Sequence, residues 1–237
     1  MAVSIKMAFT SLFTADLNAV SSSQAESSGS FGGPPTSIIR EMAHQLESWR
    51  SLLPQPLQWT EDAILDLPGG RSTTPRPEEL LFSTTGPRLG PIGHRHNLDI
   101  VNAQLRTRFY YARFMLFRPF IYKALHSPKS VTTDDADCCA LAIESACLWP
   151  MSMAPPKDKK RLVPHQFTWT QNMIGVLLIL RMTQEEGVLK QLCEGRINRD
   201  DLDSTIVLLL NWVKDVKQVD GIAEWSWNIL EPLFAEV

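Results

Sequence analysis

The sequence predicts an all-α protein, an irregular multi-helix bundle that follows a disordered N-terminal segment. From Asn97 onward, apolar residues recur at steps of three and four, which is the spacing of residues along one face of a helix. No stretch of useful length alternates apolar and polar residues in the manner of a half-buried strand. The chain also contains no internal repeat, so a solenoid of stacked helices is not expected.

The chain is predicted to divide into a flexible segment and one helical region. Residues 21–35 are rich in Ser and Gly and carry too little apolar area to stay ordered, so residues 1–35 are expected to be flexible. Residues 36–237 are predicted to form a helical domain with a long loop, rich in Pro, Gly and Thr, at about residues 54–96. The chain has 237 residues, of which 44% are hydrophobic, and this is enough for the core of such a domain.

The central element is a helix predicted over residues 97–126. Its apolar stripe consists of Val101, Leu105, Phe109, Ala112, Leu116 and Phe120. Apolar and aromatic side chains also cover most of the remaining circumference, and a helix of this kind is usually contacted on several sides. Pro119 lies inside the pattern, where it removes a backbone donor and its ring presses on the carbonyl of Met115. We therefore expect a kink or a restart at this proline.

The first helix of the domain is predicted to begin with Thr36 or Ser37 as its cap and to end at Pro54. Its apolar stripe consists of Ile38, Met42, Leu46, Trp49 and Leu53. A stripe with this spacing is predicted to face other helices.

The helix after the central one is predicted to have Thr132 or Thr133 as its cap and to be stopped by Pro150, Pro155 and Pro156. Its first turns contain Asp134, Asp135 and Asp137. Negative charge at these positions suits the helix dipole.

The remaining helices are predicted at residues 165–184, 185–194, 200–219 and 222–234. In the last of them, Trp225, Ile229 and Phe234 are expected to lie on the apolar side. If Phe109 and Trp225 both belong to the core, alanine at either position should lower the free energy of unfolding by roughly 3–5 kcal/mol.

Charge and cysteine content argue against several classes of function. The formal net charge is −3 and no strongly basic block is present, so the chain has no electrostatic footprint for nucleic acid. No two cysteines form a C-x-x-C pair, so we expect small buried thiols, no zinc cluster and no other cofactor. The cysteines are Cys138, Cys139, Cys147 and Cys193. The longest apolar run, residues 173–180, is too short to cross a bilayer, and no signal-peptide core is evident, so an intracellular soluble protein is expected.

Two acidic clusters leave an enzymatic alternative open. Residues 134–137 and 200–204 resemble the magnesium-binding motifs of class I terpene cyclases, whose carboxylates face one another across a cavity. Leu208 stands where the second motif should carry a Glu, and helix capping also explains Asp at both places. Alanine at Asp135 and Asp201 should abolish such an enzyme but cost a capped helix only ~1 kcal/mol. Since no other catalytic constellation is present, the chain is predicted not to be an enzyme.

A short basic run lies in a loop bounded by prolines. Its members are Lys157, Lys159, Lys160 and Arg161. Such a run is typical of nuclear import signals and of contacts with acidic partners, and a plain solvated loop is an equal alternative.

Several segments, in order along the chain, resemble the C-terminal part of the regulatory (middle homology) region of fungal zinc-binuclear-cluster transcription factors. The resemblance rests on residues 109–125, 147–150, 160–164 and 223–230, and it covers about residues 36–237. Its signature residues are Tyr110, Tyr111, Arg113, Arg118, Pro119, Phe120, Tyr122, Trp149, Pro150, Trp225 and Trp227.

The resemblance implies a helical regulatory domain of a nuclear transcription regulator, in some relatives one that controls a metabolic or secondary-metabolite gene cluster. The six cysteines with which that family holds two zinc ions to read DNA are absent from this sequence. DNA binding is therefore expected only indirectly, through protein–protein interaction with other transcription regulators or with a relative that carries the zinc cluster. No membrane association is implied.

Overall fold

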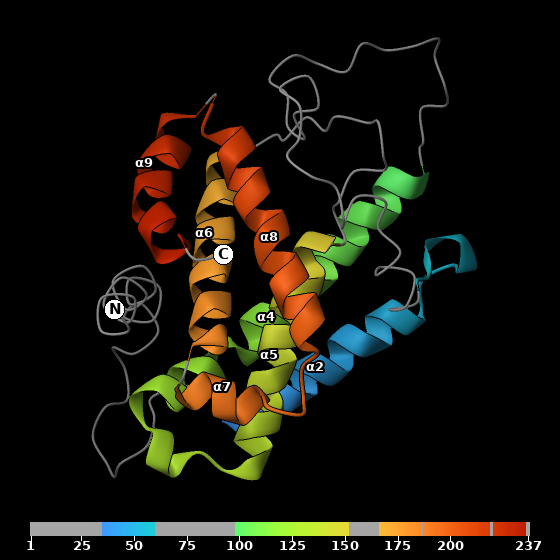
Figure 1. Ribbon diagram of the computed structural model, residues 1–237. Helices are drawn as coiled ribbons and strands as arrows, with labels where there is room; N and C mark the ends of the chain where they lie inside the picture. Colours follow the sequence, from blue (N-terminus) through green and yellow to red (C-terminus); the bar gives the residue numbers. More distant parts are fainter. Residues whose placement is uncertain (1–34, 60–97, 152–165, 186, 219, 236–237) are drawn as a thin grey trace, which may run out of the picture. The chain divides into compact units, whose positions relative to one another are not determined.

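The computed structural model describes residues 35–59, 98–151, 166–185, 187–218 and 220–235. All regular secondary structure in these ranges is helical, which confirms the predicted all-α fold class. In chain order the elements are α2 (Thr36–Ser51), the short 3-10 helix η1 (Gln55–Leu57), α4 (Leu98–His126), η3 (Pro128–Ser130), α5 (Thr133–Met151), α6 (Gln166–Gln184), α7 (Val188–Cys193), α8 (Arg199–Val216), α9 (Gly221–Leu230) and η4 (Glu231–Leu233) (Figure 1). Residues 1–34 of the predicted flexible segment and most of the predicted long loop lie outside the described residues.

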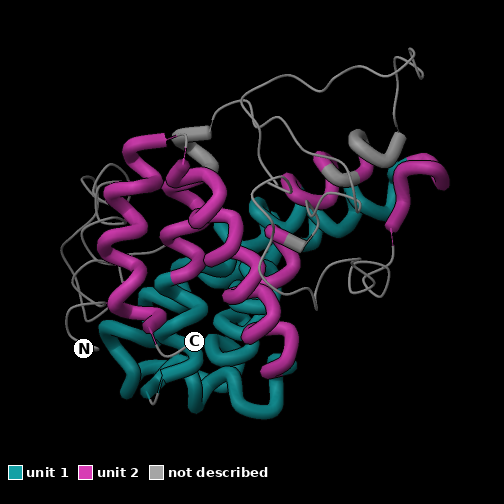
Figure 2. Tube along the Cα trace, turned by 45° about the horizontal axis from the view of Figure 1, so that its top comes forward, with its two compact units in different colours: residues 1–53, 109–146, 178–198 teal, residues 54–108, 147–177, 199–237 magenta. Residues whose placement is uncertain are grey.

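The chain forms two compact units, each assembled from segments that are far apart in the sequence. Unit 1 comprises residues 1–53, 109–146 and 178–198, and unit 2 comprises residues 54–108, 147–177 and 199–237 (Figure 2). The long helices α4, α5 and α6 each supply residues to both units.

Each unit has a core of fully buried apolar side chains. In unit 1 they include Tyr110, Ile121, Ile143, Ile179 and Leu189, and in unit 2 they include Leu177, Ile206, Leu209, Trp212 and Leu230. Residues 173–180, the longest apolar run of the sequence, are buried along their whole length. A segment of this kind reads as continuously apolar because its helix is covered on all sides.

The central helix α4 is one continuous helix through Pro119, so the predicted restart does not occur. Between Phe109 and Leu125 every residue is buried or half-buried, which fits a helix that is contacted on several sides. Its most buried face, however, lies roughly a quarter turn from the predicted stripe. Tyr110 and Ile121 are fully buried there, whereas the stripe residue Leu116 is only half-buried.

The structure corrects two predictions for α2. Pro35 occupies the N-cap position without a side-chain capping bond, so neither Thr36 nor Ser37 caps the helix. Most of the predicted core stripe is exposed, because the buried residue of α2 is Ile39, which follows the stripe residue Ile38 by one position. Ile38 is 51% exposed and Met42 is 50% exposed. A shift of one residue turns a helix by about 100°, which is enough to move the stripe out of the core.

The C-terminal helix also differs from its prediction. It ends at Leu230 and is followed by η4, and Trp225 is 64% exposed, so the prediction that Trp225 lies in the core is wrong. Phe234 is buried as expected. Trp225 and Trp227 are two residues apart and therefore point to nearly opposite sides of the helix, and only Trp227 faces inward.

Asp220 is the N-cap of α9 and fixes where this helix begins. Its Oδ1 accepts hydrogen bonds from the backbone N–H groups of Ile222 at 2.9 Å and Ala223 at 2.8 Å. Asp220→Ala is expected to lower the free energy of unfolding by about 1 kcal/mol, because both donors lose their partner. Asp220→Asn should retain most of the stability in the same urea titration. Equal losses in the two variants would contradict a capping role.

Candidate functional site

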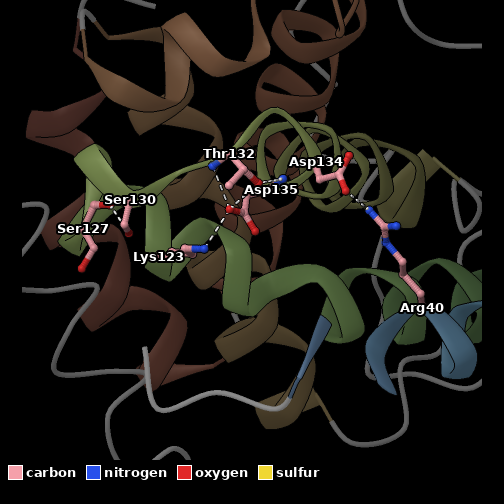
Figure 3. A network of polar contacts seen from close by, with 7 residues as sticks. All are labelled: Arg40, Lys123, Ser127, Ser130, Thr132, Asp134 and Asp135. Atoms are coloured by element: carbon pink, nitrogen blue, oxygen red, sulfur yellow. Dashed lines mark hydrogen bonds and ion pairs between the residues drawn. The ribbon is translucent and has the colours of Figure 1, made fainter. Parts of the chain in front are cut away.

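A connected polar cluster in unit 1 lies where α5 begins (Figure 3). Asp135 Oδ2 accepts hydrogen bonds from Lys123 Nζ, Thr132 N and Thr132 Oγ1, each at 2.8 Å. In return, the backbone N–H of Asp135 donates to Thr132 Oγ1 at 3.2 Å. This reciprocal pair is a capping box with an Asp in the third position, and it confirms Thr132 as the cap.

The environment of Asp135 keeps its carboxyl group ionised. Burial of the side chain raises its pKa, but hydrogen bonds from Lys123 and Thr132 to the carboxylate outweigh this effect, and the pKa lies below its ordinary value. The folded structure is therefore stabilised by the charged form of the Asp135 carboxyl group.

The other two carboxylates of the acidic cluster are also engaged by cations. Asp134 pairs with Arg40 of α2 at 2.9 Å, and Asp137 pairs with Arg196 at 2.8 Å. Hydrogen bonding to Asp134 raises the pKa of the Arg40 guanidinium. A magnesium site needs carboxylates that can turn toward the ion, and these three already have other partners. The arrangement supports the capping interpretation of this cluster.

An open pocket of about 440 Å³ lies beside this cluster. Its lining residues are Thr36, Ser37, Arg40, Lys123, Thr132, Asp134 and Asp135. Because its two cationic side chains form ion pairs with its two carboxylates, the pocket has no excess of either charge with which to attract a charged ligand.

Arg113 is the second polar centre of unit 1, and it is buried. Its Nε donates to Ser145 Oγ at 2.7 Å, its Nη2 forms an ion pair with Glu144, and its Nη1 lies 3.8 Å from Glu47. The guanidinium also lies 5.7 Å from the ring centroid of Tyr110. A pocket of about 230 Å³ next to it is lined by Ala43, His44, Glu47, Arg113, Phe117 and Leu141. Arg113 thus links α4 to α2 and α5 within unit 1, a structural role that the sequence did not reveal.

The signature residues of the resemblance are mostly core residues. Those that are buried are Tyr110, Arg113, Phe120, Trp149, Pro150 and Trp227, and those that are half-buried are Tyr111, Arg118, Pro119 and Tyr122. Trp225 alone among them is exposed. The basic run Lys157, Lys159, Lys160 and Arg161 lies outside the described residues.

The four cysteines are free, buried thiols, as the sequence predicted. A hydrogen bond joins the thiols of Cys139 and Cys193; together with burial it raises the pKa of Cys139, and it lowers the pKa of Cys193. Burial raises the pKa of Cys138 as well. Among the described residues, no group of three or more His, Cys, Asp or Glu side chains is placed to hold a metal ion.

Two helices expose apolar residues in rows, one in each unit. At α2 we call Ile38, Met42, Trp49 and the C-cap residue Leu52 the α2 stripe; on α9 the exposed apolar residues are Ile222, Trp225 and Ile229. Ile38, Met42 and Trp49 belong to the stripe that the sequence predicted to face other helices, whereas Leu52 does not. A periodic apolar pattern shows that a face needs a partner, and it does not show whether that partner belongs to the same chain.

Comparison with known proteins gives no relative: no protein family, no curated protein and no solved structure matches the chain. In the part of the chain that the structure describes, no helix has both the length and the apolar character needed to span a membrane.

Proposed function

We propose that the chain is a regulatory and interaction domain of a fungal-type transcription factor. In this proposal it acts in the nucleus, possesses no DNA-reading zinc cluster of its own, and reaches promoters through other transcription regulators. The proposal combines the resemblance of residues 36–237 to the regulatory region of that family with the surface of unit 1. A metabolic or secondary-metabolite gene cluster is the class of target that the resemblance suggests.

The observation that carries the proposal is the α2 stripe. Together with Gln45, its members follow one another at steps of four, three, four and three, which is the spacing that packs one helix against another. The largest exposure is that of Leu52, at 82%. A row of large apolar side chains in water is costly and marks a surface that binds another protein.

The polar clusters of unit 1 support an interaction domain over the cyclase alternative. Their carboxylates form ion pairs and a capping box within the fold, so they serve its stability. Both pockets are small or open, and neither presents an unopposed group of carboxylates.

The experiment is to express the tagged chain in fungal cells, sequence the DNA that co-purifies from nuclei, and assay DNA binding by the purified protein alone. We expect enrichment of promoters in cells and no binding in isolation. The double variant Met42→Asp, Trp49→Asp should lose the enrichment while remaining folded by circular dichroism, because charges on the α2 stripe prevent apolar docking.

The matched control is Val207→Asp, which places the same charge on an exposed apolar residue of α8. It should leave promoter enrichment unchanged. DNA binding by the purified chain would contradict the proposed function. So would co-purified nuclear DNA in which promoters are not enriched.

A further inference from the structure

We propose that Cys139 and Cys193 are a redox modification site at which a peroxide forms a disulfide between α5 and α7. Cys193 is the thiol that reacts with the peroxide, and Cys139 then completes the disulfide. The inference concerns unit 1 alone, goes beyond the proposed function and does not depend on a role in transcription.

The two thiols are in contact inside unit 1. Cys139 lies within the first two turns of α5, and Cys193 is the last residue of α7. A hydrogen bond joins their side chains, which are 0% and 5% exposed. Two cysteines whose side chains already touch can be bridged with a small movement of the backbone, whereas distant cysteines cannot.

A separate ion pair holds the end of α7 against the start of α5. Arg196 Nε donates to Asp137 Oδ1 at 2.8 Å, and these two residues lie close in sequence to the two cysteines. The backbone N–H of Arg196 donates to the carbonyl of Cys193 at 3.0 Å, across a turn in which Gly195 has a φ of +73°. The proximity of the two thiols is therefore supported by contacts other than their own.

The surroundings of the pair make Cys193 the nucleophile. The hydrogen bond that Cys139 donates lowers the pKa of Cys193, and the positive charge of Arg196 lowers it further, whereas burial opposes both effects. The same hydrogen bond, together with burial, raises the pKa of Cys139. A peroxide is attacked by a thiolate and not by a thiol, so Cys193 is oxidised first.

Cys193 is also the thiol that local opening exposes more readily. α7 has six residues, of which only Leu189 and Cys193 are buried. A helix this short is not stable by itself and depends on its packing, so we expect it to separate from unit 1 more often than α5, which has 19 residues. A peroxide can then reach Cys193 while Cys139 stays in place.

The reaction balances with one molecule of hydrogen peroxide. The Cys193 thiolate attacks one peroxide oxygen, the O–O bond breaks, hydroxide leaves and a sulfenic acid forms. The sulfur of Cys139 then attacks the sulfenic sulfur as its own proton leaves, so that an S–S bond forms, the S–O bond breaks and water departs. The two thiols lose two electrons, and the peroxide is reduced to water.

The test treats the purified full chain with an excess of hydrogen peroxide and maps the cysteines by mass spectrometry after digestion without a reductant. We expect two of the four free thiols to disappear, one cross-link between residues 139 and 193, and recovery of both thiols with dithiothreitol. Cys139→Ser should leave Cys193 as a sulfenic acid that dimedone traps. Cys193→Ser should slow the oxidation of Cys139 by at least about tenfold.

Arg196→Gln and Asp137→Asn are matched variants, because both break the same ion pair and only the first removes the positive charge. Arg196→Gln should slow formation of the cross-link several-fold, and Asp137→Asn should not slow it. Cys147→Ser changes a buried cysteine of unit 2 and should leave the cross-link unchanged.

The native chain alone can overturn the proposal, even if a serine variant fails to fold. A cross-link of Cys193 to Cys138 or Cys147 in place of Cys139 would overturn it. So would four thiols that all survive the peroxide, or oxidation that proceeds without any cross-link between residues 139 and 193. Equal rates in Arg196→Gln and Asp137→Asn would overturn the assignment of Cys193 as the nucleophile.

Discussion

Phe109→Ala is expected to lower the free energy of unfolding by roughly 3–5 kcal/mol. Phe109 is 1% exposed, and its ring makes an edge-to-face contact with Tyr110 at a centroid distance of 5.2 Å. The guanidinium of Arg50 lies 5.2 Å from the same centroid, so the ring also links α2 to α4 within unit 1. Alanine leaves a cavity in place of the ring and removes both contacts. Urea unfolding monitored by circular dichroism measures the loss.

Trp225→Ala is the control for this experiment. The sequence alone assigned it the same cost, but its exposure now predicts a change within about 0.5 kcal/mol. If the two variants lose similar stability, the burial of α4 or the exposure of the outer side of α9 is incorrect.

Asp135→Asn is expected to lower the free energy of unfolding by roughly 1.5–3 kcal/mol at neutral pH. The amide can still accept hydrogen bonds from Thr132, but it removes the charge that Lys123 faces at 2.8 Å in a mostly buried pair. The expected cost exceeds the ~1 kcal/mol of a simple helix cap, because an ion pair is lost as well.

The pH dependence of this difference has a defined sign. The pKa of Asp135 is lowered in the folded state, so its stabilising contribution is complete above the unfolded pKa of about 3.9 and is lost as the pH falls through the folded pKa. The difference between the native protein and Asp135→Asn should therefore shrink below about pH 4. Asp134→Asn removes an exposed ion pair and should cost less than about 1 kcal/mol. A difference for Asp135→Asn that does not change with pH would contradict the ion pair.

Local chemistry was the part of the fold that the sequence predicted best. The helical spacing predicted the fold class, and Thr132 or Thr133 followed by aspartates predicted the start of α5, where the structure selects Thr132; a capping box involves only residues that are close in sequence. Asp220 is the same kind of local signal before α9, which was predicted to begin at Ile222 on apolar spacing alone.

The direction in which each helix faces could not be predicted in the same way. Trp225 and Trp227 are equally apolar, and only the contact of α9 with α8 decides that Trp227 is the buried one. The same holds for α2, where Ile38 and Ile39 are adjacent and only Ile39 is buried. The ion pairs of Arg113 join residues about thirty positions or more apart in the sequence, so they could not be predicted from residue spacing.

The four buried thiols can be used to measure local opening of the folded protein. A maleimide can modify a thiol only after the surrounding helices separate, so the rate of alkylation measures how often that region opens. Cys138, Cys139 and Cys193 belong to unit 1, whereas Cys147 belongs to unit 2. Pulsed alkylation read by mass spectrometry can therefore follow the two units separately in the unmodified chain. Matching rates at Cys147 and Cys193 would mean that the units open together, and faster labelling at one of them would identify the less stable unit.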